Sequence, residues 1–386
     1  MRRVRLSGCR DDDLMREGLL RAFRWHAARL LPNPFGLGRP FSNAKRRRVL
    51  MLSEPGSIPQ SQVFPFHFYQ REIFARWQHE LREVSTAVFE TAPENAPGHA
   101  DVVCVQTWFD LTSERCEKLF ASIRTRNPSA KIVYLDSFAP TDLRLAAMLD
   151  SHVDLYLKKH LFRDRSRYFE PTRGDTNLVD YYGRRYGLEY KETHHVIPEG
   201  FLRKLMVGPS FCASPYMLPE FFDHRSPRRL SQRIDVHARL GTSGGGWYQA
   251  MREDAVKVID GIGQLNVASQ PGVRPSQYRR ELRSSRTCFS PFGYGEVCWR
   301  DYEAVLYGAL LIKPEMGHVA TEPDIFVPDV TYVPVAWDFG DVQQVLDAWL
   351  KDAVGRAAVV ERAYQRLHDY ARTGGFVDQM RPIFQD

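Results

Sequence analysis

The stretch SPFGYGEVCWRDYEAVLYGALLIKP, residues 290–314, decides the fold. It joins glycines, two glutamates and an arginine to a segment of helical period, 299–308, and then to a short apolar run that ends in Pro314. Glycine lets a backbone approach a ligand closely, and the free amides at the start of a helix favour an anion. The pattern predicts an anion-binding turn between a strand and a helix, with a buried strand behind it.

Two side chains on this helix suit one kind of ligand. Arg300 and Glu303 are three positions apart, so they share a face of the helix. A guanidinium can bind a diphosphate through two parallel hydrogen bonds. A carboxylate can accept hydrogen bonds from both hydroxyls of a ribose. Together the two residues would hold a nucleoside diphosphate.

Short apolar runs alternate with helical segments along the rest of the chain. In the N-terminal half we expect strands at 49–53, 101–106, 130–136 and 153–159, and helices at 68–84, 113–126 and 141–149. In the C-terminal half we expect strands at 233–241, 264–269, 287–292, 309–314 and 331–337, and helices at 250–262, 275–285, 299–308 and 341–353. This alternation predicts parallel sheets. We therefore expect an α/β fold of two tandem Rossmann-like domains that face each other across a cleft, where ligands bind.

Changes in composition suggest where the domains begin and end. Residues 1–48 form a basic N-terminal tail, 49–205 the first domain, and 233–386 the second. The segment between them, 206–232, is rich in Pro, Ser and Phe, so we interpret it as a linker. Residues 163–195 are polar and aromatic without a clean period, which predicts an insertion or loop.

Length and composition narrow the class of protein. A chain of 386 residues with 43% hydrophobic and 26% charged residues is typical of a multidomain globular protein. We expect no transmembrane helix and no secretory signal, because uninterrupted apolar windows are missing. The six cysteines are scattered without a C-x-x-C pair, as in a reducing cytoplasm.

The positive charge is concentrated in the tail. Residues 1–48 contain 13 Lys and Arg but 4 Asp and Glu, whereas the rest of the chain contains 40 and 43. A near-neutral body argues against nucleic-acid binding. Within 14–31, Met15, Leu19 and Phe23 share a helical face with Leu30, which predicts an amphipathic helix that contacts an anionic membrane. The alternatives are a helix packed on the body and a disordered arm.

The segment that contains Arg300 and Glu303 resembles part of a known enzyme family. RDYEAVLYGALLI, residues 300–312, resembles the helix–Gly–strand segment of glycosyltransferases of the GT-B fold, in which the Glu of an E-A-L-x-x-G turn binds the donor's ribose. Arg300, three residues earlier, is similar to the exostosin-type pattern. Residues 275–292 and 321–350 resemble the family's base-to-phosphate stretch and its closing segment, and 60–69 looks like an acceptor-side loop.

The resemblance implies an enzyme that moves a sugar from a nucleotide-sugar donor to a glycan or lipid-linked acceptor, as in polysaccharide biosynthesis. The second domain would bind the donor, and the first the acceptor. It implies that Glu303 binds the ribose, that Arg300 and Arg239 bind the phosphates, and that Gly293 and Gly295 let the backbone reach the diphosphate. The full set of donor-binding residues that we expect is Arg239, Tyr278, Phe292, Gly293, Tyr294, Gly295, Glu296, Arg300 and Glu303. Neutralising the leaving diphosphate would be the main electrostatic task.

One feature departs from the family pattern. Retaining members often carry two glutamates eight positions apart, whereas Glu296 and Glu303 are seven apart, and Gly295 occupies the expected place. The sequence therefore leaves retention or inversion of the anomeric centre open.

We expect the first domain to supply a base for the acceptor hydroxyl. We consider His67, Asp110 and Asp136, which lie just after predicted strands, although Asp also favours helix caps and turns. The pair Lys158–Lys159 at the end of the fourth strand is expected to be solvated.

We expect no metal and no cofactor other than the donor substrate. The one D-x-D pattern is in residues 11–13 of the tail, where an acidic helix cap is the simpler interpretation, and His194–His195 has no other ligand at metal spacing. We expect a cytoplasmic protein, placed at the inner membrane face if the tail binds lipid. Two alternatives stay open: a nucleotide-sugar epimerase of the same fold, and a binding module that has lost turnover.

Overall fold

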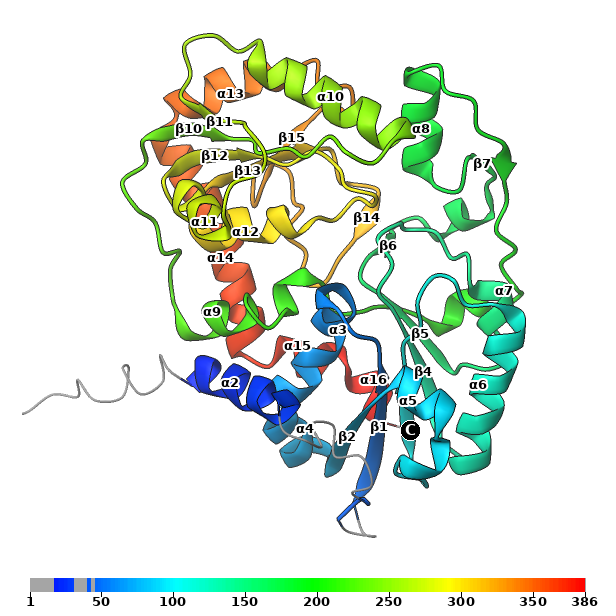
Figure 1. Ribbon diagram of the computed structural model, residues 1–386. Helices are drawn as coiled ribbons and strands as arrows, with labels where there is room; N and C mark the ends of the chain where they lie inside the picture. Colours follow the sequence, from blue (N-terminus) through cyan, green and yellow to red (C-terminus); the bar gives the residue numbers. More distant parts are fainter. Residues whose placement is uncertain (1–16, 31–39, 43–45, 386) are drawn as a thin grey trace, which may run out of the picture. The chain divides into compact units, whose positions relative to one another are not determined.

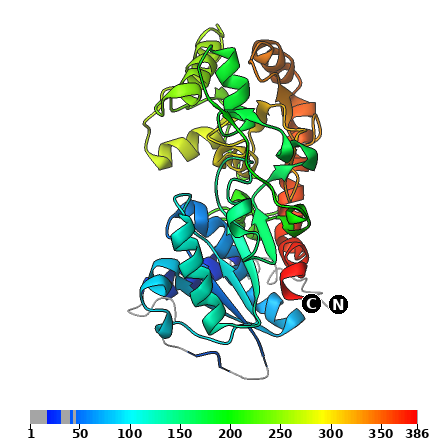
Figure 2. The same cartoon turned by 90° about the vertical axis from the view of Figure 1, so that its right-hand side faces the viewer.

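The computed structural model describes residues 17–30, 40–42 and 46–385. Two larger sheets organise the chain (Figure 1, Figure 2). The first has the order β2-β1-β3-β4-β5-β9, and the second has the order β11-β10-β12-β13-β15. Strand β1 pairs in parallel with β2 and β3, and β10 does so with β11 and β12. The prediction of two Rossmann-like parallel sheets is confirmed.

The strands are short and mostly buried. The first sheet contains β1 (Arg47–Ser53), β2 (His79–Ser85), β3 (Val102–Val105), β4 (Lys131–Asp136), β5 (Leu155–Lys158) and β9 (Leu205–Val207). The second contains β10 (Ile234–His237), β11 (Val267–Ala268), β12 (Ser285–Phe289), β13 (Leu310–Pro314) and β15 (Val333–Val335). Two antiparallel pairs join β6 (Leu161–Phe162) to β14 (Val319–Ala320) and β7 (Thr172–Arg173) to β8 (Glu192–Thr193).

Helices connect the strands. They are α2 (Glu17–Leu30), α3 (Ser57–Phe68), α4 (Gln70–Trp77), α5 (Thr86–Thr91), α6 (Ser113–Arg126), α7 (Ala146–Leu149), α8 (Asn177–Arg185), α9 (Leu218–Asp223), α10 (Gly246–Asp260), α11 (Pro275–Arg283), α12 (Trp299–Tyr307), α13 (Val342–Lys351), α14 (Ala353–Arg372), α15 (Gly375–Gln379) and α16 (Arg381–Phe384). None of the helices within the described residues is long and apolar enough to cross a membrane.

Both sheets reverse their strand order at the equivalent place. From β1 the chain moves to β2 on one side and returns to β3 on the other, and β10, β11 and β12 repeat this path. The reversal places a topological switch point at the carboxyl ends of the first and third strands of each sheet. Ligands of open α/β sheets bind at such switch points.

Three local predictions are corrected. Residues 79–85 form β2, not the end of a helix over 68–84, because α4 ends where Gln78 adopts a left-handed conformation with φ 58°. Residues 60–69, predicted as an acceptor-side loop, lie largely in α3. Residues 163–195, predicted as an insertion or loop, contain α8 and the β7–β8 pair.

By compactness the chain divides into two units. The first contains residues 1–134, 212–225 and 368–386, and the second contains 135–211 and 226–367. The domain boundaries expected from the sequence, and the cleft between the domains, stay predictions.

Candidate active site

The turn that enters α12 is held by a buried polar network. The backbone N–H of Cys298, the residue before the helix, donates to Asp301 Oδ2 at 2.8 Å. Ser290 Oγ donates to Asp301 Oδ1 at 2.6 Å, and Lys313 Nζ lies 3.2 Å from Asp301 Oδ2. Ser290, Asp301 and Lys313 are fully buried. The network fixes the start of α12 behind the loop 290–296, and the helix ends at Gly308, whose φ is 80°.

The glycines of this loop serve close packing. A Cβ on Gly295 would lie 1.8 Å from the carbonyl oxygen of Ala139, so no other residue fits. A Cβ on Gly293 would lie 3.2 Å from Cys298 Sγ, a tight but smaller conflict. Packing against the chain therefore explains Gly295 by itself, and the ligand-approach role of both glycines stays a prediction.

The two aromatic residues of the loop have different environments. Phe292 is fully buried, and Lys313 Nζ lies 5.1 Å from its ring centroid. Tyr294 is about half exposed and stacks on Tyr248 of α10, with ring centroids 4.3 Å apart. Tyr294 is therefore open to a ligand, whereas Phe292 belongs to the core.

Arg239, which follows β10, already has a counter-ion. Its Nε and one terminal nitrogen donate to the two carboxylate oxygens of Glu281 at 2.5 and 2.8 Å. This fork lowers the pKa of Glu281, so the carboxylate stays charged and compensates the arginine. The backbone carbonyl of Arg239 accepts a hydrogen bond from Arg300 at 2.6 Å. A direct role of the Arg239 guanidinium on phosphate stays a prediction.

Two other arginines have no such counter-ion. Arg252 on α10 is 5% exposed, and the Nε atoms of Arg252 and Arg300 are buried without a hydrogen-bond partner. In the part of the chain that the structure describes, neither guanidinium takes part in an ion pair. Burial, together with the charge of Arg300, lowers the pKa of Arg252. The charge of Arg300 therefore acts against that of Arg252, while the nearby Glu303 carboxylate interacts favourably with Arg300.

Glu303 lies beside this pair. Its Oε2 accepts a hydrogen bond from the Tyr278 hydroxyl at 2.8 Å, and the side chain is partly exposed. The buried ring of His237, at the end of β10, meets Tyr278 edge-on at 4.8 Å. Burial and the charge of Arg300 lower the pKa of His237 to about 3, so its imidazole is neutral. Glu303, Tyr278 and Arg300 therefore lie close together, and their role in binding a nucleoside stays a prediction.

Glu296 belongs to a separate buried cluster. It accepts a hydrogen bond from Thr141 Oγ1 at 2.5 Å, and its Oε2 lies 3.3 Å from His160 Nε2. His318 Nε2 lies 3.7 Å from Oε1. Burial alone would raise the pKa of Glu296, but His160 and His318 hold it well below its ordinary value. The carboxylate is fully buried, and its predicted donor-binding role stays a prediction.

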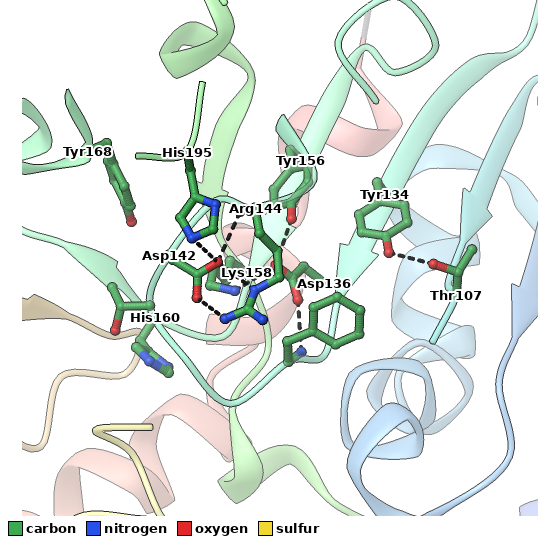
Figure 3. A network of polar contacts seen from close by, with 12 residues as sticks. Thr107, Tyr134, Asp136, Asp142, Arg144, Tyr156, Lys158, His160, Tyr168 and His195 are labelled. Carbon is green, nitrogen blue, oxygen red and sulfur yellow. Dashed lines mark hydrogen bonds and ion pairs between the residues drawn. The ribbon is translucent and has the colours of Figure 1, made fainter. Parts of the chain in front are cut away.

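Asp136 sits in a second buried network (Figure 3). Its Oδ2 accepts from Lys158 Nζ at 2.6 Å and from the Tyr156 hydroxyl at 2.7 Å, while Oδ1 accepts from the backbone of Phe138 at 2.8 Å. Both carboxylate oxygens of Asp136 are thus already engaged by donors of the protein itself. The assignment of Asp136 as the base stays a prediction without support from this geometry.

The expectation that Lys158 and Lys159 are solvated is wrong, because each is 1% exposed. Lys159 Nζ lies 4.4 Å from the centroid of the Phe211 ring and has no hydrogen-bond partner. Burial, with the charge of Lys158, lowers the pKa of Lys159 to about 7. The chain that follows β5 is thus drawn into the core.

The switch point of the first sheet contains a carboxyl group that the sequence reasoning missed. Glu54 directly follows β1 and is 3% exposed, and its Oε1 is buried without a hydrogen-bond partner. Its backbone N–H donates to the side chain of Gln106, which follows β3. Burial raises the pKa of Glu54 to about 7. The charge of Arg115 opposes this shift, whereas the charges of Glu90 and Asp110 add to it. This is the pKa that suits a general base near neutral pH.

The surroundings of Glu54 are polar. A guanidinium nitrogen of Arg115 lies 3.6 Å from a carboxylate oxygen of Glu54 and another lies 3.8 Å from one of Asp110. The same guanidinium donates two hydrogen bonds to the carboxylate of Glu90, at 2.7 and 3.1 Å. A pocket of about 330 Å³ lies against Arg115, Glu90 and the exposed side of α6. Phe109, two residues beyond the end of the Gln106–Thr107 turn, is 70% exposed.

The remaining candidate bases lie in this same unit with other partners. His67 Nε2 is 2.8 Å from Glu83 Oε2, and Ser53 Oγ donates to the other oxygen of Glu83 at 2.6 Å. Asp110 is largely exposed and pairs with Arg115. Both assignments stay predictions.

No group of three or more His, Cys, Asp and Glu side chains that could hold a metal occurs among residues 17–30, 40–42 and 46–385. The D-x-D pattern at 11–13 lies outside the described residues. Metal independence stays a prediction.

Comparisons with known proteins bear on the fold. No family model matches the chain, and no curated protein matches it. Among solved structures, an alpha-glucosyltransferase in complex with UDP matches with a TM-score of 0.50, covering 88% of this chain and 100% of that chain at 11% identity. The chain has the fold of GT-B glycosyltransferases. A complex of alpha-glucosyltransferase with UDP and a 13-mer DNA containing an HMU base matches equally, at 10% identity.

The resemblance stated from the sequence is thus confirmed at the level of the fold. The exostosin-like subtype stays a prediction. Glu54 could have been found by the rule applied to His67, Asp110 and Asp136, since it follows a predicted strand directly. Arg252 had no such signal, because an arginine in a helix is usually solvated.

Proposed function

We propose that this protein is a glycosyltransferase that moves a sugar from a nucleoside-diphosphate sugar to a hydroxyl group of an acceptor. The observation that carries the proposal is the pair of Arg252, which is buried, and Arg300, which is partly buried, near the switch point of the second sheet; within the described residues neither guanidinium takes part in an ion pair. Burying an unpaired charge is costly, and two neighbouring like charges add to the cost. A bound diphosphate would remove both penalties.

The same pair would assist the reaction. When the bond between the sugar and the phosphate breaks, negative charge accumulates on the leaving diphosphate. Cations that are fixed in place before the reaction stabilise that charge without reorganising. Arg300 is fixed by its hydrogen bond to the Arg239 carbonyl, and Arg252 by its burial in α10.

Glu303 completes the donor site in this proposal. One carboxylate oxygen is held by Tyr278, which orients the side chain, and the group is partly exposed. It would accept hydrogen bonds from the ribose hydroxyls. The two similar structures contain UDP, which supports uracil as the first base to test.

We assign the acceptor to the switch point of the first sheet, with Glu54 as the proton acceptor. As the acceptor oxygen bonds to the anomeric carbon, its proton would pass to the Glu54 carboxylate, and the nucleoside diphosphate would leave. Glu54 suits this role better than Asp136, whose oxygens are saturated. A glycan or lipid-linked acceptor, transfer without a metal, and a cytoplasmic location at the inner membrane face are parts of the proposal. We propose no nucleic-acid partner, because the chain beyond residue 48 has more acidic than basic residues.

Thermal denaturation against UDP-, GDP-, dTDP-, ADP- and CMP-sugars tests the proposal. A ligand at about 100 times its dissociation constant stabilises by roughly 2.7 kcal/mol, a shift of a few degrees. We expect one nucleotide family to raise Tm, and Arg300→Met to abolish that rise.

The alternatives predict other results. Conversion of the nucleotide sugar without an acceptor would assign the chain to the epimerases. A Tm rise without turnover would assign it to the binding modules. No rise with any nucleotide sugar, in folded protein, would contradict the donor site.

A further inference from the structure

Helix α2 is fixed to the first compact unit by one face (Figure 1). The Asp223 carboxylate accepts hydrogen bonds from the first-turn amides of Gly18 and Leu19 at 2.7 and 3.0 Å. Arg21 donates to the Phe68 carbonyl at 3.0 Å. The Trp25 ring is buried edge-on against Phe64, with centroids 5.0 Å apart. The helix is therefore part of the folded body, which confirms one of the alternatives for the tail.

The outer face of α2 is apolar. Leu19, Leu20 and Phe23 are 50%, 52% and 69% exposed. Positions 19, 20 and 23 adjoin on a helix, so the three side chains form one patch. Scattered exposed apolar residues are normal, but a gathered patch on an anchored helix indicates a surface that binds something.

The charge around this patch selects the occupant. Arg24, next to Phe23, is exposed. The sequence of α2 contains three arginines and one glutamate, and Glu17 is paired with Arg21. Apolar side chains that enter the acyl region, flanked by basic groups that meet anionic headgroups, are the features of an interfacial helix. We propose that the outer face of α2 docks on the surface of an anionic lipid bilayer.

A second copy of this chain fits the patch less well. Dimerisation through α2 would bring together two copies of a helix that contains three arginines and one glutamate, and like charges at an interface oppose association. The inference is independent of the proposed transfer reaction, because it concerns a surface and not the sites at the two sheets.

Co-sedimentation of the full chain with vesicles tests the proposal. The vesicles are phosphatidylcholine alone, or phosphatidylcholine with about 30% phosphatidylglycerol. We expect binding at least about tenfold tighter to the anionic vesicles, and weaker binding at high salt because exposed charges are screened. Phe23→Asp should weaken it by about tenfold or more, because a charge replaces the most exposed apolar group.

Val354→Asp is the matched control. Val354, on α14, is 81% exposed, so the substitution makes the same change of charge at another exposed apolar position. We expect it to bind like the wild type. Circular dichroism and Tm should be unchanged in both variants, since neither side chain is packed.

Three results would overturn the proposal. The first is equal binding of the wild type to neutral and anionic vesicles, or no binding to either. The second is equal binding by the wild type and Phe23→Asp. The third is a dimer in sedimentation velocity that Phe23→Asp dissociates, which would assign the face to a second copy.

Discussion

The switch points of the two sheets have the same strand order and opposite electrostatics. Beyond β1 and β3, one arginine, Arg115, faces three carboxylates: Glu54, Glu90 and Asp110. Beyond β10 and β12, two arginines, Arg252 and Arg300, take part in no ion pair within the described residues. The first place holds a carboxyl with a pKa of about 7, and the second holds cations.

This difference shows that the topology of a sheet determines where a ligand can bind, whereas the side chains determine which ligand is favoured. Strand order places a crevice at the carboxyl edge of each sheet, whatever residues occupy it. The side chains that reach each crevice then determine which ligand is favoured. An excess of carboxylates favours proton transfer and neutral hydroxyl groups, whereas unpaired guanidinium groups favour a diphosphate.

The largest effect that we expect concerns the first switch point. Glu54→Gln removes the proton acceptor and should lower the transfer rate by about 10²- to 10⁴-fold, the usual contribution of a general base. The wild-type rate should rise as pH rises through about 7, where Glu54 ionises. The pH–rate profile of the variant should not show this rise. Glu94→Gln, at an exposed position of the same unit, is the control and should be neutral. A normal pH profile in Glu54→Gln would remove Glu54 from the mechanism.

The second prediction concerns the loop that follows β12. Gly295→Ala places a methyl group 1.8 Å from the Ala139 carbonyl oxygen and should destabilise the protein by about 1–3 kcal/mol or more. Gly263→Ala is the control, since nothing lies within 4 Å of its Cβ position. Urea denaturation measures both, and equal stabilities would show that the loop relaxes freely.

A smaller effect separates the ribose from the phosphates. Glu303→Ala should weaken UDP binding by about tenfold, the value of one or two hydrogen bonds to a charged group. Binding of inorganic pyrophosphate, which lacks a ribose, should be unchanged. If both ligands weaken equally, the carboxylate acts through Arg300 and not on the ribose.

A further prediction concerns a pH-dependent difference in stability. Because the pKa of Glu54 is raised from 4.5 to about 7, the folded protein keeps a proton that the unfolded chain releases. Wild-type stability should therefore fall, relative to Glu54→Gln, as pH rises from 4.5 to about 7, and the difference should then level off. Tm measured across this range for both proteins checks the sign. A difference that does not change with pH would contradict the raised pKa.

The sequence predicted the elements whose apolar runs are continuous. β1, β3, β4 and β13 are buried along most of their lengths, as central parallel strands usually are. The strand β2, with the sequence HELREVS, was missed because five of its seven residues are polar. Its pattern continues that of the preceding helical segment, so the sequence predicted one long helix. Its buried Glu80 and Glu83 are satisfied by Ser42 and Ser53, partners that lie far away in the sequence.

The candidate site was predictable only where its features depend on residues that are close together in the sequence. Arg300 and Glu303 could be paired because their spacing on one helix is local information. Arg252, Lys159 and Glu54 acquire their properties from burial, which depends on how distant segments pack. Asp136 was a reasonable candidate by position, but Lys158 and Tyr156 occupy its oxygens.

The most direct test of the central claim is calorimetric titration of UDP into the wild type and three Arg→Met variants. Arg252→Met and Arg300→Met should each weaken binding by about 10- to 100-fold, because each removes a charge-assisted contact to the diphosphate. Arg286→Met should bind like the wild type, since Arg286 lies on β12 but pairs with Asp235 at 2.6 Å. Unchanged affinity in Arg252→Met and Arg300→Met, or an equal loss in all three variants, would contradict a diphosphate site at the second sheet.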